Sequence, residues 1–152
     1  MRKKCRRRVY ALVNPIESAI LGACVSAEKP LNTLRLAELS ALDAVTRGVG
    51  KPEDFRWLMD VLNISECMAK DGIGIELLPI CKQAQESLLE AVERYNNTGK
   101  LGLSGVGIKA VKEMIELHDL QRTSVARSVY ENAIRKTANR IRSRANDVVE
   151  IK

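Results

Sequence analysis

Aromatic side chains are scarce in this chain: one Trp, one Phe and three Tyr make up 3% of its 152 residues. Hydrophobic residues nevertheless reach 45%, so leucine, isoleucine, valine and alanine must fill the interior of the fold. The sequence also lacks sustained period-two alternation rich in β-branched residues, internal repeats and low-complexity segments. Its length fits one domain. The composition therefore favours helices packed on helices, in a single domain spanning residues 1–152.

Cysteine and histidine, which commonly carry catalysis or bind metals, are few in this chain. Cys5, Cys24, Cys67 and Cys81 match neither a zinc-ligand pair nor a redox C-x-x-C motif, and three of them fall within hydrophobic helical stretches, so we expect reduced thiols rather than disulfides. The single histidine, His118, falls on the apolar stripe of a predicted helix, where a hydrogen-bonded core residue is the usual role. We therefore predict no enzyme, no catalytic residue, no metal site and no cofactor.

No apolar run approaches the roughly 20 residues that a membrane-spanning helix needs. The N-terminus imitates an export signal, because a basic start precedes an apolar stretch and residues 21–24, Leu-Gly-Ala-Cys, look like a lipoprotein cleavage site. However, Asn14, Pro15 and Glu17 interrupt that stretch, and a charge is the wrong chemistry inside a signal peptide. We predict no membrane association and a cytoplasmic location.

Helix starts and stops are legible in the sequence, because prolines, glycines and capping side chains fall between apolar stretches. The predicted helices span approximately 14–27, 32–47, 52–71, 74–95, 104–121 and 124–148, the last being either a sixth helix or a bent continuation of the fifth. This pattern predicts an all-α fold, a compact bundle of five to six helices.

Apolar spacing predicts which faces of these helices are buried. In the second helix, leucines such as Leu36 and Leu39 fall on more than one face, so we expect that helix to be well buried. The fourth helix carries the most regular repeat, which alternates by four and three residues and marks a seam against other helices. The residues of that repeat are Leu77, Cys81, Ala84, Leu88, Ala91 and Tyr95.

Charge is distributed unevenly along the chain. Residues 9–121 hold eleven bases and sixteen acids, whereas residues 122–152 hold eight bases and three acids. A basic N-terminal arm, residues 1–9, contains no acid and would ordinarily be a nucleic-acid-binding tail. Its bases are Arg2, Lys3, Lys4, Arg6, Arg7 and Arg8. An alternative is that the arm lies against acids of the fourth helix, namely Glu86, Glu90 and Glu93.

The last predicted helix is basic on every side that an apolar stripe does not occupy. The stripe consists of Ile134, Ala138, Ile141, Ala145 and Val148, which pack either within the monomer or against a second copy, so a homodimer stays open. The bases are Arg135, Lys136, Arg140, Arg142 and Arg144. Phosphates would be bound non-specifically and with strong salt dependence. An acidic protein surface satisfies the same charges, and the sequence does not separate these two partners.

One glycine-rich segment, residues 103–110, is similar to the turn of helix-hairpin-helix proteins. That resemblance implies a phosphate-binding loop in which Gly105 and Gly107 expose backbone N–H groups and Lys109 assists. Ser104 stands where that motif normally has proline, and a serine-capped helix start explains the same residues.

Two longer stretches carry a different resemblance. Residues 36–64, with the runs ALDA and LNI, and residues 99–121, ending in ELHDLQ, are similar to small uncharacterised helical proteins encoded by phages and prophages of proteobacteria. That resemblance implies a cytoplasmic setting in a bacterial host cell and transfers no activity. The expected function is a non-enzymatic accessory protein that binds nucleic acid. The alternative is an inhibitor or adaptor that binds an acidic surface of a host protein, such as a defence-system component.

Overall fold

The computed structural model describes residues 28–143, and within this range the chain is all-α. Five α-helices and one short 3-10 helix follow one another without a strand in the described range. They are α2 (Glu28–Thr46), α3 (Pro52–Lys70), η1 (Ile75–Leu77), α4 (Leu78–Thr98), α5 (Gly105–Thr123) and α6 (Arg127–Arg142). The predicted all-α bundle is thereby confirmed, while the predicted helix over 14–27 lies outside the described residues. None of the described helices combines the length and hydrophobicity required to cross a bilayer.

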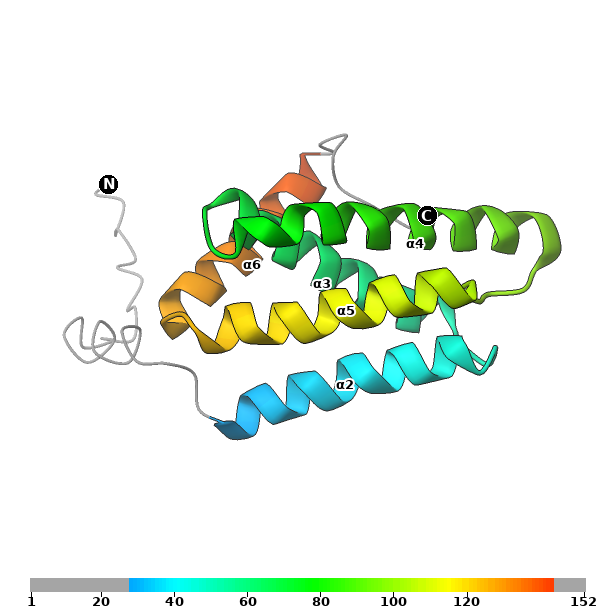
Figure 1. Cartoon of the computed structure of the whole chain (residues 1–152), viewed down its shortest axis with the longest axis horizontal. Coiled ribbons are helices and arrows are strands. Elements are labelled where there is room, and N and C mark those ends of the chain that lie inside the picture. The colour runs from blue at the N-terminus through cyan, green and yellow to red at the C-terminus, as the bar shows by residue number, and fades with distance from the viewer. Residues whose placement is uncertain (1–27, 144–152) are drawn as a thin grey trace, which may run out of the picture.

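Helix α3 is the centre of the bundle. It packs against α2, α4, α5 and α6, and in Figure 1 it lies behind a layer in which α5 runs between α4 and α2. Ten residues of α3 are buried, and the side chains of Phe55, Leu58 and Met68 have no exposed surface. The hydrophobic core therefore surrounds α3 and fixes the positions of the other helices.

The seam predicted for α4 is present. Five of its six residues are buried, from Leu77 to Ala91, and Tyr95 is half-buried. Helix α5 approaches α4 closely at Gly107, where an added Cβ would lie 3.1 Å from the Cβ of Ser87. The lack of a side chain at Gly107 allows the two backbones to approach closely at this point.

Local signals set the helix ends much as the sequence predicts. Pro52 occupies the first turn of α3, and the preceding backbone N–H of Lys51 donates to Asp54 at 2.8 Å. Gly99 ends α4 with a φ of +68°, a conformation that favours glycine. Ser104 caps α5, because its Oγ accepts from the N–H of Gly107 at 3.1 Å.

Helix α2 differs from the prediction in its start and in its burial. It begins at Glu28, so Pro30 lies within the first turn, where proline is tolerated, rather than before the helix. Leu36 and Leu39 are 66% and 40% exposed, so the expected burial of several faces is wrong for the described structure. The physical reason is position: α2 lies at the edge of the bundle and packs on α3 and α5 with one face.

Helix α6 is a separate helix, and its inward face is not the predicted one. Tyr130, Ala133 and Thr137 are buried, whereas Ile134 is 40% exposed. Among the described members of the predicted apolar stripe, Ile134 is exposed and Ala138 and Ile141 are half-buried, so they do not form the buried face of α6, while Ala145 and Val148 lie outside the described residues. Tyr130 sets the rotation of the helix, because its ring packs with Met68 and its hydroxyl reaches His118.

We expect Ser104→Ala to lower the free energy of unfolding by about 1 kcal/mol, because the N–H of Gly107 loses its partner at the start of α5. Ser40→Ala, at an exposed position on α2, is the matched control and should change stability by less than about 0.5 kcal/mol. Urea denaturation of both variants measures the difference. Equal effects would show that this cap contributes nothing.

Candidate functional site

The bases predicted on the last helix do not share one environment. Arg135 and Arg142 are exposed, and Arg140 is half-buried. The Nζ of Lys136 lies 2.6 Å from the Oδ2 of Asp71, so this charge is partly neutralised within the protein. Asp71 also raises the pKa of Lys136 by accepting its hydrogen bond. Arg144 and the six bases of the N-terminal arm lie outside the described residues.

Positive charge is nevertheless concentrated on α6. Residues 127–143 contain five bases and one acid, whereas residues 28–126 contain twelve bases and fifteen acids. The single acid, Glu131, pairs with Arg127 at 2.6 Å. Helix α6 therefore has a net positive charge, whereas the other described helices together have a net negative charge.

An apolar flank lies beside these bases on α6. Ile134 is 40% exposed, and Ala138 and Ile141 are half-buried. These three residues are the beginning of the stripe predicted from sequence, displaced from the packed face to its side. Helix α6 therefore presents arginines and aliphatic side chains together.

The candidate phosphate loop has the geometry of a capped helix start. Gly105 and Gly107 lie in the first turn of α5, and the N–H of Gly107 is occupied by the Oγ of Ser104. Gly107 is buried against Ser87, so its lack of a side chain serves close helix packing. Lys109 is exposed. Phosphate binding at this position stays a prediction.

A buried ion pair, which the sequence reasoning missed, joins α2 to α5. Arg122 has no exposed surface and Glu38 is 2% exposed. The two N–H ends of the guanidinium donate to the two carboxylate oxygens, Nη1 to Oε1 at 2.5 Å and Nη2 to Oε2 at 2.9 Å. Burial raises the pKa of Glu38, and Arg122 opposes that rise. The two-bond geometry is that of an ionised carboxylate held by an arginine fork.

Asp119 extends this pair to the surface. Its Oδ1 accepts from Nε of Arg122 at 2.9 Å, and its Oδ2 accepts from Nε of Arg35 at the same distance. Arg35 also donates to Asn32 at 2.9 Å, so the start of α2 is tied to the end of α5. Burial works to raise the pKa of Asp119, but the two arginines outweigh it and the pKa falls below its usual value.

His118 is a hydrogen-bonded core residue, as its position on the apolar stripe predicts. Its Nδ1 lies 3.0 Å from the Oε1 of Gln121, and its Nε2 lies 3.3 Å from the hydroxyl of Tyr130. The amide of Gln121 in turn donates to the carbonyls of Ser65 and Ile73. Burial lowers the pKa of His118 to about 4, so the ring is neutral near pH 7. The ring has no exposed surface, which removes it from contact with a ligand in solution.

The sequence did carry a signal for the ion pair. Glu38 stands among the apolar positions that α2 buries, between Leu31 and Ala41, and a charge there needs a buried partner. Arg122 was instead counted with the basic C-terminal segment. Net charge sums do not distinguish a base that is paired in the core from one on the surface.

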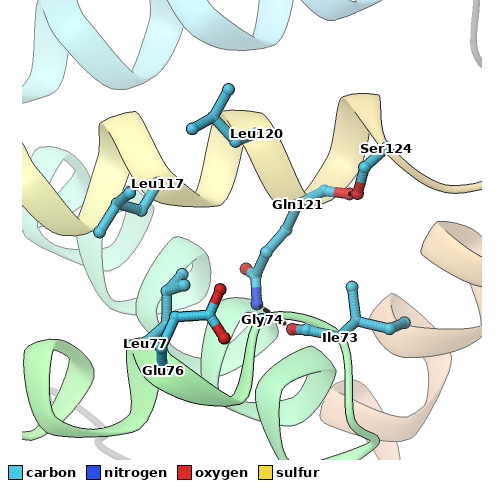
Figure 2. A pocket seen from close by; sticks show the side chains of 8 residues that line it. All are labelled: Ile73, Gly74, Glu76, Leu77, Leu117, Leu120, Gln121 and Ser124. Atoms are coloured by element: carbon cyan, nitrogen blue, oxygen red, sulfur yellow. Dashed lines mark hydrogen bonds between the residues drawn. The ribbon is translucent and has the colours of Figure 1, made fainter.

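A shallow hollow of about 230 Å³ lies between the end of α5 and the segment that contains η1 (Figure 2). Gln121, the hydrogen-bond partner of His118, forms part of its wall. Its walls are mainly aliphatic, and the side chain of Glu76 stands at one side of it. The lining residues are Ile73, Gly74, Glu76, Leu77, Leu117, Leu120, Gln121 and Ser124. The hollow is therefore suited to an apolar side chain rather than to a polar small molecule.

Metal-ligating groups do not converge within residues 28–143: no three His, Cys, Asp or Glu side chains are placed to hold an ion there. Cys67 and Cys81 are free, buried thiols, as expected for these two cysteines. Comparison with known proteins found no matching family model, no similar curated protein and no similar solved structure. Functional inference consequently depends on the geometry of the chain itself.

We expect Arg122→Met to lower the free energy of unfolding by about 3–5 kcal/mol, because it leaves the Glu38 carboxylate buried without its partner. The double variant Arg122→Met with Glu38→Leu should recover most of this loss, since both charges are then gone. Urea denaturation at neutral pH measures both. A double variant as unstable as the single one would contradict the ion-pair explanation.

Acidification should destabilise the fold through His118. Below about pH 6.5 the unfolded chain protonates this ring, whereas the folded chain keeps it neutral down to about pH 4. The free energy of unfolding should therefore fall across this window by up to about 1.4 kcal/mol per pH unit. Denaturation curves of the parent chain and of His118→Asn isolate the effect, because only the parent retains the ring. Parallel pH profiles would contradict it.

Proposed function

We propose that this protein binds nucleic acid non-specifically through the outer face of α6, assisted by the basic N-terminal arm, and that it performs no catalysis. The observation that carries the proposal is the segregation of charge: five bases and one acid on residues 127–143, against a net excess of acids on residues 28–126. Such segregation attracts a polyanion to one side of the molecule and repels it from the rest. The proposed setting is the cytoplasm of a bacterial cell that carries a phage.

The geometry of α6 supports this use. The helix buries a narrow face, Tyr130, Ala133 and Thr137, and packs on the bundle through α3. Arg135 and Arg142 are exposed and, at 100° per residue, project away from that buried face. A helix presented in this way can lie along a phosphate backbone without reading bases.

A second candidate partner, an acidic surface of a host protein, is favoured by the apolar flank of α6. Ile134 is 40% exposed beside the arginines, and an aliphatic side chain adds little to phosphate binding. Protein interfaces, in contrast, combine apolar contacts with charges at their rim. An inhibitor or adaptor that blocks a defence-system component would use both features.

We expect the double variant Arg135→Glu with Arg142→Glu to weaken binding to a short DNA duplex at low salt by roughly 10- to 100-fold. The slope of log affinity against log salt should decrease by about two, because two phosphate contacts are lost. Gel shifts or fluorescence anisotropy at several salt concentrations measure both quantities.

The matched control reverses the same number of charges elsewhere: Lys82→Glu with Lys100→Glu, both exposed on α4 and its following loop. This control should reduce affinity by less than about threefold, because the bases lie outside the proposed interface. Equal losses in the two double variants, or no binding by the parent chain at low salt, would reject the nucleic-acid proposal.

Ile134→Ser separates the two candidate partners. It should leave the affinity for DNA unchanged, since it removes no charge, whereas capture of an acidic host protein from a nuclease-treated extract should fall. Loss of a captured protein together with absence of DNA binding would favour the second candidate.

A further inference from the structure

The hollow between α5 and η1 is lined by aliphatic side chains and has the carboxylate of Glu76 at its edge. Leu120 is 63% exposed on one rim, and Ile75, just outside the lining, is 64% exposed. Figure 2 shows the Glu76 carboxylate between Leu77 and the Gln121 amide. Leu120 and Ile75 extend the aliphatic lining of the hollow onto the surface, and an apolar patch with a polar rim is the usual form of an interaction site.

Further acids lie along the same side of α5. Glu113 and Glu116 are exposed and precede Leu117 and Leu120 by four residues, which places them one helical turn away on the same face. Lys112 neutralises Glu116 only weakly, at 3.9 Å. The hollow therefore fits an aliphatic or aromatic side chain that stands next to positive charges.

The Gln121 side chain in the wall of the hollow is already engaged by the protein. Both N–H groups of the Gln121 amide donate to backbone carbonyls, and its Oε1 accepts from Ser65 at 2.9 Å and faces His118. Recognition must then come from apolar contact inside and from carboxylates at the edge.

One segment of this chain combines apolar side chains with neighbouring positive charges. Residues 6–13 read Arg-Arg-Arg-Val-Tyr-Ala-Leu-Val, three bases followed directly by an apolar stretch. They lie outside the described residues, so only their sequence and their position in the chain enter here. The volume of about 230 Å³ is sufficient for one aromatic or two aliphatic side chains.

The connection to α2 makes the hollow reachable from this segment. Arg35 binds Asp119, so the start of α2 lies beside the end of α5, where Leu120 and Ser124 line the hollow. Fourteen residues separate Val13 from Glu28. They span at most about 50 Å when extended and about 21 Å as a helix. The hollow lies on the side of α5 that faces η1 and α4, away from α2, and the extended length is sufficient to pass around α5 and reach it.

We propose that residues 6–13 dock in the hollow of the same molecule, with an apolar side chain inside and the arginines against Glu76 and the acids of α5. Docking within one chain benefits from the high effective concentration that a short connection gives. It withholds part of the basic arm from other anions. Nucleic acid would then compete with the carboxylates for these arginines, but the docking itself does not depend on nucleic-acid binding.

Disulfide trapping in the full chain tests this proposal in the absence of nucleic acid. In a Cys5→Ser, Cys24→Ser background, Val9→Cys is combined with Leu120→Cys, and the rate of intramolecular disulfide formation is followed by mass spectrometry. The matched control combines Val9→Cys with Leu89→Cys, because Leu89 is 43% exposed on α4 close to Glu86, Glu90 and Glu93. We expect at least a roughly tenfold faster reaction at position 120 than at position 89.

Adding Glu76→Lys to the Leu120→Cys protein should slow the reaction toward the rate of the control, because it removes the charge that pairs with the arginines. Equal rates at the two positions, a disulfide formed between two molecules, or no effect of Glu76→Lys would overturn the proposal. Adding Arg135→Glu should leave the disulfide rate unchanged while weakening DNA binding. Failure of docking and failure of the proposed function are thus measured separately.

Discussion

The ion pair between Arg122 and Glu38 holds together the parts of the structure on which the rest depends. Burying two charges costs several kcal/mol each unless they face one another with good geometry, so the pair tolerates only one register of α2 on α5. Asp119 continues the link to Arg35 and thereby adds a second connection between α2 and α5. A purely aliphatic contact would let the helices slide at a smaller cost.

The end of α5 that the ion pair holds in place also positions α6 and the hollow. The same end of α5 that carries Arg122 also carries His118, whose Nε2 faces the hydroxyl of Tyr130 and orients α6. It also carries Leu120 and Gln121, which line the hollow shown in Figure 2. The last two turns of α5 thus carry both the buried polar groups and one wall of the hollow, and the contact between His118 and Tyr130 joins them to the start of α6.

Local signals in the sequence predicted the parts of the fold that neighbouring residues decide. The Ser104 cap, the proline start of α3 and the α4 seam need no knowledge of the tertiary arrangement. The exposure of Leu36 and the rotation of α6 were predicted wrongly, since each depends on which helices lie adjacent. Arg122 was missed for the same reason: a base at the end of a helix reads as solvated until Glu38, 84 residues away, is placed beside it.

Thr137 places a buried polar group where α6 packs on the rest of the bundle. Its hydroxyl is buried against the bundle and has no hydrogen-bond partner among residues 28–143, and Thr137 is the last of the three residues that attach the helix. An unsatisfied polar group at a packed interface weakens the contact there, so α6 is held less firmly at Thr137 than at Tyr130 and Ala133. The attachment of α6 to the core around α3 therefore depends mainly on Tyr130 and Ala133, which lie in the N-terminal half of the helix and pack with Met68.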